Sequence, residues 1–161
     1  MAFKTADLCD EHSETIQIAL PGMLSYGGKA RFSGRIVTLK LFEDNSLLRD
    51  MLSNGGEGQV IVVDGGGSMR CALLGDMLAS NAVNNSWGGL VINGCIRDSA
   101  DIAKMNIGIR ALGTHPLKSV KRGNGEVNVP VSFSNVEFIP GDYLYADEDG
   151  IIVAPEALMP V

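Results

Sequence analysis

The sequence predicts an α/β protein with a mixed central sheet, flanking helices and a second small sheet. In the middle of the chain, short apolar runs alternate with stretches of helical spacing in a β-α-β-α-β order. The regions on either side are rich in β-branched and turn residues, which is typical of short strands. The length of 161 residues is that of one domain, so we expect residues 1–161 to form a single unit.

The first half of the chain opens with a predicted helix and continues with elements separated by glycines. Capping residues at its start predict a helix over Thr5–Leu20, which Pro21 ends. Alternating apolar and polar residues predict a strand over Ala30–Leu41, and leucines at helical spacing predict a helix over Asn45–Leu52. The continuous apolar run Gln59–Val63 lies between glycines, as in a strand buried on both faces.

The second half repeats this alternation before it turns into short strands. Helical spacing predicts helices over Gly75–Ser86 and Ser99–Met105. Between them, the apolar run Leu90–Ile92 predicts a buried strand, followed by a loop over Gly94–Asp98. The remaining expected strands are Ile107–Leu112, Glu126–Phe133, Val136–Phe138, Tyr143–Tyr145 and Ile151–Val153.

Composition and charge argue against several classes of function. The net charge is -6 and the 13 Lys and Arg residues are scattered, whereas a nucleic-acid-binding protein carries a basic face, so we expect no direct nucleic-acid partner. No apolar run reaches the roughly 18 residues of a membrane span, and no signal-peptide core begins the chain. The three cysteines lack C-x-x-C spacing and predict neither a zinc site nor a disulfide framework. We therefore expect a cytoplasmic protein without a membrane partner.

Two segments carry residues suited to binding a small acid. Gly75-Asp76-Met77-Leu78 opens a predicted helix, where free N–H groups and the helix dipole attract a carboxylate. Arg97 and Asp98 follow a buried strand, where α/β sheets commonly bind ligands. Arg97 can hold a carboxylate or keto oxygen with two donors, and Asp98 offers hard oxygen ligands for Mg²⁺ or Mn²⁺. By themselves, these residue types also fit a surface ion pair.

The spacing of these segments resembles a family signature. Asp76, twenty further residues and then Arg97-Asp98 match the Asp-x20-Arg-Asp motif of the RraA-like family, which contains metal-dependent 4-hydroxy-4-methyl-2-oxoglutarate aldolases and regulators of ribonuclease E activity. The resemblance extends over essentially the whole chain. It includes Leu8 to Asp10, Leu41 to Asn45, Val62 to Gly67, Gly141 to Asp147 and Gly150 to Ile152.

This resemblance implies a fold, an assembly and roles for the site residues. The fold would be a swivelling β/β/α domain that assembles as a homotrimer, in some members as a dimer of trimers. The backbone of Gly75 to Leu78 would bind the carboxylate of a small 2-oxo acid, and Arg97 would contact the substrate. Asp98 would hold a divalent metal cation, Mg²⁺ or Mn²⁺. Asp76 and Arg97 would be the catalytic residues, with Asp76 orienting water at the cation.

The implied reaction is a metal-assisted cleavage that leaves the enolate of pyruvate. Cleavage of 4-hydroxy-4-methyl-2-oxoglutarate would yield two pyruvates, and decarboxylation of oxaloacetate would pass through the same enolate. The residue that accepts the C4 hydroxyl proton stays open among Asp10, Glu11 and Glu43. Longer aldolases of the family contribute a Glu from a C-terminal extension, whereas this chain ends at Val161. We therefore expect decarboxylation, which has no hydroxyl proton to remove, to depend less on such a Glu than aldol cleavage does.

A second function stays open, because the family also contains protein inhibitors that bind ribonuclease E. The short C-terminus and Leu41 to Asn45 resemble those regulators, and the acidic balance suits contact with a basic, RNA-binding partner. A third function, methyl transfer from a nucleotide cofactor, has no support, because the sequence contains no G-x-G-x-x-G fingerprint. Structural roles are expected for His115, in a turn before Pro116, and for Trp87, as a packing anchor.

Overall fold

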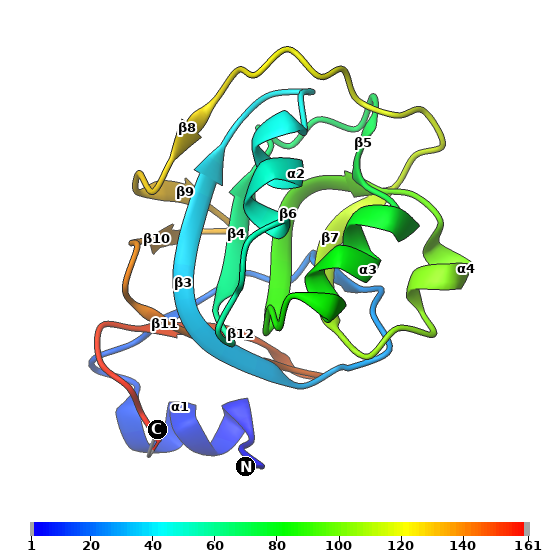
Figure 1. The fold of residues 1–161 in the computed structure, drawn as a ribbon. Helices are drawn as coiled ribbons and strands as arrows, with labels where there is room; N and C mark the ends of the chain where they lie inside the picture. Colours follow the sequence, from blue (N-terminus) through cyan, green and yellow to red (C-terminus); the bar gives the residue numbers. More distant parts are fainter. Residues whose placement is uncertain (1, 160–161) are drawn as a thin grey trace.

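A curled mixed sheet of ten strands dominates the computed structural model, which describes residues 2–159 (Figure 1). The strand order along its main path is β1-β12-β11-β3-β4-β6-β7-β2, while β5 pairs with β6 and β8 pairs with β3. Strands β9 and β10 form a separate two-stranded sheet. This combination of a mixed sheet, flanking helices and a small second sheet confirms the predicted fold class.

The elements are short and follow one another closely. The helices are α1 (Thr5–His12), α2 (Ser46–Leu52), α3 (Asp76–Asn84) and α4 (Ser99–Ile102). The strands are β1 (Gln17–Ile18), β2 (Leu24–Ser25), β3 (Phe32–Lys40), β4 (Val60–Asp64), β5 (Ala72–Leu74), β6 (Gly89–Ile96), β7 (Gly108–Thr114), β8 (Glu126–Val127), β9 (Val131–Phe133), β10 (Val136–Phe138), β11 (Tyr143–Asp147) and β12 (Gly150–Ala154). Within residues 2–159, no helix is both long and apolar enough to cross a bilayer.

Strand β3 joins two differently built halves of the sheet. Its first residues pair antiparallel with β11, whereas Ile36–Lys40 pair in parallel with β4. Beyond β4 the pairing continues in parallel to β6 and then to β7. The carboxyl ends of these parallel strands therefore meet at one edge of the sheet, which is where α/β proteins usually bind ligands.

Apolar side chains fill both faces of the parallel half. Figure 1 shows α2 and α3 in front of these strands, and Leu48 and Leu52 of α2 are fully buried in the cluster that also holds Ile61 and Leu90. A second cluster on β3 and β4 contains Ile36 and residues of the small β9–β10 sheet. Burial on both faces confirms the interpretation of the continuous apolar run that forms β4.

The predicted helix over Thr5–Leu20 is wrong beyond His12. Helix α1 ends there, and Gln17–Ile18 instead form β1 and pair antiparallel with β12. The segment around Ile16 and Ile18 carries β-branched residues, which favour a strand once a partner strand is available. Pairing with a strand from the far end of the sequence thus decides the conformation here.

Other differences from the predicted elements also come from long-range pairing. The predicted loop over Gly94–Asp98 begins only at Arg97, because β6 continues to Ile96 beside β5 and β7. The predicted strand Glu126–Phe133 divides into β8 and β9, with Asn128 between them at a φ of 55°. Helix α4 ends at Ile102, short of Met105, and the sequence did not predict β2 or β5.

The ring of Phe32 occupies space that two glycines leave free on neighbouring strands. Gly89 of β6 and Gly108 of β7 are paired in register. A Cβ atom built on Gly89 would lie 2.3 Å from the Phe32 ring, and one built on Gly108 would lie 2.0 Å from it. The guanidinium of Arg110 lies 5.3 Å from the centre of the same ring. Packing around Phe32 therefore requires glycine at both positions.

Substitution of Gly108 by Ala should lower the free energy of unfolding by about 1–3 kcal/mol, because the added methyl group overlaps a buried ring. Urea denaturation measures the change. Gly55→Ala is the matched control, since nothing lies within 4 Å of a Cβ atom at Gly55. Combining Gly108→Ala with Phe32→Leu should recover part of the loss. Equal stability of the Gly108 and Gly55 variants would show that the ring does not need this space.

Candidate functional site

A cavity of about 220 Å³ opens at the carboxyl edge of the parallel strands. Pockets for drug-sized ligands measure roughly 300–1,000 Å³, so this cavity suits a smaller ligand. The residues that the sequence predicted for the site all line it: Gly75, Asp76, Met77, Leu78, Arg97 and Asp98. The fold therefore brings both predicted segments to one place, and their roles in binding and catalysis stay predictions.

The end of β6 places Arg97 and Asp98 beside the start of α3. The Arg97 N–H donates to the carbonyl of Leu74 at 2.9 Å, which holds the end of β6 against β5. Asp98 then adopts a left-handed conformation with φ 57° and ψ 38°, which Asp tolerates better than most residues. In this turn, its Oδ2 accepts a hydrogen bond of 3.0 Å from the N–H of Asp76, the first residue of α3. A carboxylate from a distant strand end thus caps α3.

Gly75 is required by the close approach of these two side chains. A Cβ atom at position 75 would lie 2.9 Å from Oδ2 of Asp98 and 3.4 Å from Nε of Arg97. The backbone at Gly75 has a φ of −125°, which any residue can adopt. The constraint on this position is therefore space for Arg97 and Asp98 and not backbone strain.

The predicted carboxylate cradle at the start of α3 is partly occupied by the protein's own acids. The Asp76 N–H donates to Asp98, and the Met77 N–H donates to Oδ1 of Asp76 at 2.8 Å. A substrate carboxylate would have to displace these side chains or use the neighbouring N–H of Leu78, which lies in the same first turn. Met77 itself is 78% exposed, so its side chain forms the rim of the cavity.

Sequence reasoning missed three cations and one amide that also line the cavity. They are Arg49 from α2, Lys118 and Lys121 from the connection after β7, and Asn45 at the start of α2. With Arg97 they give four cationic side chains against the two carboxylates of Asp76 and Asp98. A cavity with excess positive charge concentrates anionic ligands, in a chain whose net charge is -6. These residues are far from the motif in sequence, so no local pattern pointed to them.

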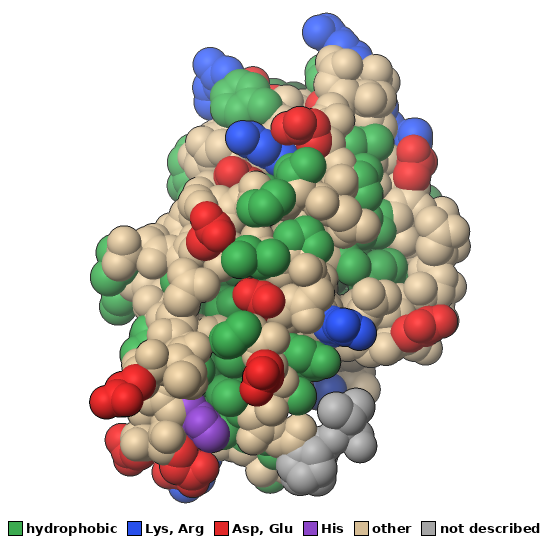
Figure 2. Space-filling view, turned by 90° about the vertical axis from the view of Figure 1, so that its left-hand side faces the viewer, with side chains coloured by type: hydrophobic (Ala, Val, Ile, Leu, Met, Phe, Trp, Pro, Cys, Tyr) green, Lys and Arg blue, Asp and Glu red, His purple; other side chains and the backbone are tan. Residues whose placement is uncertain are grey.

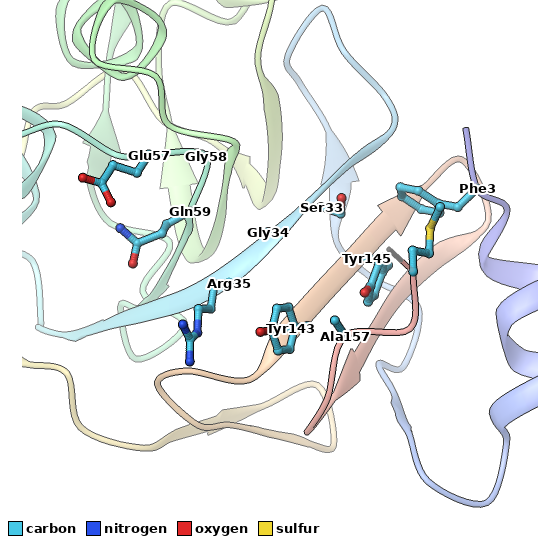
Figure 3. A pocket seen from close by; sticks show the side chains of 11 residues that line it. Phe3, Ser33, Gly34, Arg35, Glu57, Gly58, Gln59, Tyr143, Tyr145 and Ala157 are labelled. Atoms are coloured by element: carbon cyan, nitrogen blue, oxygen red, sulfur yellow. The ribbon is translucent and has the colours of Figure 1, made fainter. Parts of the chain in front are cut away.

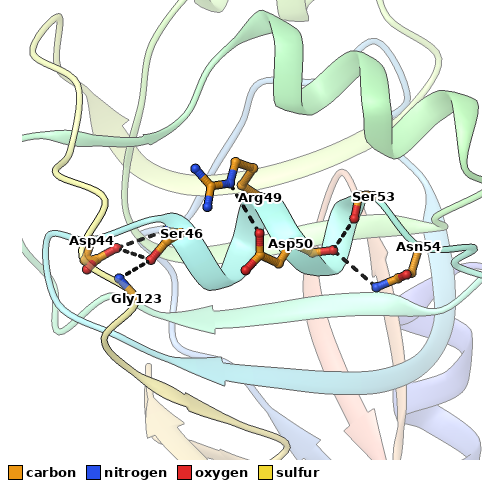
Figure 4. A network of polar contacts seen from close by, with 7 residues as sticks. All are labelled: Asp44, Ser46, Arg49, Asp50, Ser53, Asn54 and Gly123. Carbon is orange, nitrogen blue, oxygen red and sulfur yellow. Dashed lines mark hydrogen bonds and ion pairs between the residues drawn. The ribbon is translucent and has the colours of Figure 1, made fainter.

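A buried carboxylate fixes the segment that carries the two lysines (Figure 4). Asp44 is 2% exposed, and its Oδ1 accepts hydrogen bonds from the N–H and hydroxyl of Ser46. Its Oδ2 accepts from the N–H groups of Arg122, at 2.8 Å, and Asn124. Burial alone would raise the pKa of Asp44, but these hydrogen bonds outweigh it and lower the pKa to about 2. Asp44 therefore stays ionised and ties the start of α2 to the turn after Lys121.

The donor set fits a divalent cation that keeps most of its water ligands. Oδ1 of Asp98 has no hydrogen bond among the described residues, and the Asp76 carboxylate lines the same cavity. Within residues 2–159, no group of three or more His, Cys, Asp or Glu side chains is arranged to hold a metal. Mg²⁺ commonly binds through one or two carboxylates together with water and substrate oxygens. Asp98 with Asp76 is compatible with that mode and not with a metal cage built from protein alone.

The three carboxylates considered for proton transfer lie outside the cavity. Asp10 and Glu11 belong to α1, which Figure 1 places at the opposite end of the molecule from the carboxyl edge of β6. Glu43 binds Arg70 through two hydrogen bonds of 2.7 and 2.8 Å and accepts another from Ser68. The Arg70 guanidinium and the Ser68 hydroxyl lower the pKa of Glu43. An ion-paired carboxylate with a lowered pKa is a poor proton acceptor.

The residues expected to be structural have that role. Nδ1 of His115 accepts a hydrogen bond from the Leu117 N–H, which forms the expected turn. Trp87 is 8% exposed within the main core, and its indole N–H donates to the carbonyl of Asn54. Cys71 and Cys95 are buried free thiols.

A larger cavity of about 530 Å³ contains none of the predicted site residues (Figure 3). Figure 3 shows Arg35 beside Tyr143, and the guanidinium lies 5.7 Å from the ring centre. Glu57 and Gln59 form another part of its wall. This cavity has one cation and one carboxylate, so it lacks the charge bias of the smaller cavity. Size alone would select it, but the chemistry favours the cavity at Asp98.

Charge is unevenly distributed over the outer surface. Figure 2 shows most of the Lys and Arg side chains of this face at its upper end and acidic side chains around the histidine at its lower end. The lower end holds α1, whose sequence is TADLCDEH. The upper end is the side of the carboxyl edge in Figure 1. On the face shown, basic side chains therefore gather toward the end of the molecule at which the parallel strands have their carboxyl ends.

The fold and the cavity together define an α/β protein with a small, cation-lined cavity, the candidate site, at the carboxyl edge of its parallel strands. The sequence profile of the RraA-like family, described as Aldolase/RraA, matches residues 5–153. The chain belongs to the RraA-like family, which confirms the resemblance inferred from Asp76 and Arg97-Asp98.

Similar proteins carry more than one name. A protein of Laribacter hongkongensis, provisionally named 4-hydroxy-4-methyl-2-oxoglutarate aldolase, is 60% identical over 99% of this chain and 100% of its own length. A crystal structure from Geobacillus kaustophilus, titled as an S-adenosylmethionine:2-dimethylmenaquinone methyltransferase, is 50% identical over 97% of both chains with a TM-score of 0.95. The RNA-processing inhibitor RraA from Thermus thermophilis is 46% identical over 100% of this chain and 98% of its own, also with a TM-score of 0.95.

Stability should fall as the pH is lowered from about 4 toward 2, in part because Asp44 becomes protonated. Its pKa in the folded state lies below the ordinary value of 3.8, so the stabilisation is present above that value and is lost as the pH falls through about 2. Unfolding in urea at a series of pH values measures the effect. Asp44→Asn removes the ionised acceptor, so this variant should be less stable at pH 7 and should show a shallower acid dependence. Parallel pH curves for both proteins would contradict the role assigned to Asp44.

Proposed function

We propose that the protein is a divalent-metal-dependent lyase that cleaves 4-hydroxy-4-methyl-2-oxoglutarate into two pyruvates and decarboxylates oxaloacetate as a side activity. The observation that carries this proposal is the meeting of Arg97, Asp98 and the start of α3 in one small cationic cavity. The 60% identical relative with an aldolase name supports the same reaction class. The methyltransferase title of the Geobacillus structure finds no support in this chain, which lacks a nucleotide-binding fingerprint.

The cavity's own cations suit the charge of the substrate. A 2-oxo dicarboxylate brings two negative charges, and Arg49, Lys118 and Lys121 can attract the carboxylate that is remote from the reacting bond. Arg97 can donate two hydrogen bonds to the carboxylate and keto oxygen of the pyruvyl part. Asp98 would hold the cation with Asp76 beside it. When bound there, a divalent cation would supply Lewis-acid stabilisation of the negative charge that develops on the keto oxygen.

Both reactions require stabilisation of the negative charge that develops on the same enolate of pyruvate. In aldol cleavage the C3–C4 bond breaks, its electron pair becomes the enolate of pyruvate, and the C4 hydroxyl loses a proton as the carbonyl of the second pyruvate forms. In decarboxylation the same bond breaks, the electron pair again enters the enolate, and CO₂ leaves. Protonation at C3 completes both reactions. In each case Arg97 would stabilise the enolate oxygen with its positive charge, which is electrostatic preorganisation.

We also propose that the protein assembles as a homotrimer, as the family resemblance implies. Large apolar side chains are exposed on the segments next to the cavity, which is typical of a surface that contacts another protein. They include Phe42 at 57%, Met77 at 78% and Leu117 at 59% exposure.

Purified protein with Mg²⁺ or Mn²⁺ should release pyruvate from oxaloacetate and from 4-hydroxy-4-methyl-2-oxoglutarate above the metal-only background, and EDTA should stop the release. Asp98→Ala should reduce the rate to background, because the carboxylate that holds the cation is gone. Arg97→Ala should lower kcat about 100-fold or more, as for loss of a transition-state donor, while its elution volume in gel filtration stays that of the wild type.

Asp101→Ala is the matched control for these variants. Asp101 lies in α4, only three positions beyond Asp98, and does not line the cavity. Its removal should leave the rate unchanged. If Asp98→Ala retains the wild-type rate, the proposed reaction does not take place at this site.

A second function, inhibition of ribonuclease E by direct binding, is favoured by the 46% identical RNA-processing inhibitor with nearly the same fold. The acidic end of the molecule at α1 offers charge complementarity to a basic partner surface. A pull-down with purified ribonuclease E should retain the chain at micromolar concentration, and 0.5 M salt should weaken the complex. If ribonuclease E does not retain the chain at these concentrations, the second proposed function is wrong, and the proposed lyase activity is unaffected.

A further inference from the structure

The side chain of Asn45, a residue in the wall of the cavity, has a buried oxygen without a hydrogen-bond donor among the described residues. Asn45 is 6% exposed, and its backbone N–H donates to Oγ of Ser119 and to the carbonyl of Val120. Its side-chain Nδ2 donates to the carbonyl of Leu73 at 2.9 Å. Its Oδ1, however, is buried and has no hydrogen-bond partner among residues 2–159. A buried acceptor without a donor costs free energy that a suitable donor would recover.

The orientation of this amide follows from its surroundings. If the amide were turned over, its oxygen would face the carbonyl oxygen of Leu73, and two acceptors would meet. Nδ2 must therefore point to Leu73, and Oδ1 is turned away from it. Asn45 is one of the residues that line the cavity with Gly75 and Arg97. Because Oδ1 itself is fully enclosed, a donor can reach it from the cavity only when a bound ligand displaces the atoms that cover it.

The proposed substrates differ in whether they can supply such a donor. Their ionised carboxylates and keto oxygens only accept hydrogen bonds. Oxaloacetate in its keto form therefore has nothing to offer Asn45. In a 4-hydroxy-2-oxo acid, the C4 hydroxyl is the one group that donates. A site that binds a substrate hydroxyl through a buried partner discriminates strongly against analogues that lack it.

We infer that Asn45 is a specificity-determining residue whose Oδ1 accepts a hydrogen bond from the C4 hydroxyl of the bound substrate. This inference rests on the proposed function and adds to it a preference for 4-hydroxylated acids. An amide does not take up a proton at neutral pH, so Asn45 selects and orients the hydroxyl and is not its base. Lys118 and Lys121, which line the same cavity, stay free for the substrate carboxylates.

The preference can be measured with ligands that are not cleaved. In the pair 2,4-dihydroxyglutarate and 2-hydroxyglutarate, the keto group needed for cleavage is absent and the C4 hydroxyl is the single difference. Calorimetric titration of the wild type in Mg²⁺ should show about 10-fold tighter binding of the dihydroxy acid, as expected for one recovered hydrogen bond. In Asn45→Ala, the two affinities should agree within about 2-fold. 2-Oxoglutarate serves as a third ligand that reports on the proposed site itself.

Asn45→Asp is the matched variant, because its carboxylate also accepts a hydrogen bond. The added charge weakens both members of the pair alike, since they carry the same charge, so the ratio of their affinities should stay near the wild-type value. Thermal unfolding and the affinity for 2-oxoglutarate verify that each variant is folded and keeps its cavity.

The outcomes separate this inference from the function on which it rests. If the wild type binds 2-oxoglutarate but does not distinguish the pair, or if Asn45→Ala keeps the preference, the role of Asn45 is wrong and the proposed function stands. If 2-oxoglutarate does not bind to the wild type, the proposed function is wrong and the role of Asn45 with it.

Discussion

The double pairing of β3 is the constraint on which the rest of the structure depends. One end of this strand pairs antiparallel with β11 and the other pairs in parallel with β4, so a single strand belongs to two half-sheets with different directions. The ring of Phe32, the first residue of β3, packs against Gly89 and Gly108, and a side chain at either glycine would overlap the ring. In the parallel half, the carboxyl ends of β4 and β6 therefore lie at one edge of the sheet, and the candidate site is formed at that edge.

At this edge, the Asp98 carboxylate accepts a hydrogen bond at the N-terminus of α3. Anionic ligands commonly bind at this position of a helix. Oδ2 of Asp98 accepts the first N–H of α3, and Gly75 leaves the space for it. This hydrogen bond fixes the position of the carboxylate that we propose as a cation ligand. The cationic side chains around the cavity balance the two acids and leave an excess of positive charge. The cavity thus brings two carboxylates and four cationic side chains into one small volume.

Two solved structures with different functional titles share the fold of this chain. Structures titled as a methyltransferase and as an inhibitor of RNA processing both superpose on this chain with a TM-score of 0.95. A shared fold places strands and helices, but chemistry depends on the side chains at the edge. We base the proposed binding of a small oxo acid on the side chains of Arg97, Asp98 and Asn45 at that edge. The proposed protein-binding surface lies apart from them, at α1.

The sequence by itself determined the α/β class, the strands β3 and β4, and the two segments that contain Gly75 and Arg97-Asp98. These features are local, because hydrophobic periodicity and a motif of fixed spacing depend on neighbouring residues. Only the tertiary structure decided that Gln17–Ile18 form a strand, that Asp98 caps α3, and that Asn45 and Lys121 join the site. Such contacts join residues far apart in the chain, and the free energy that favours them arises only when the strands pair and the core packs.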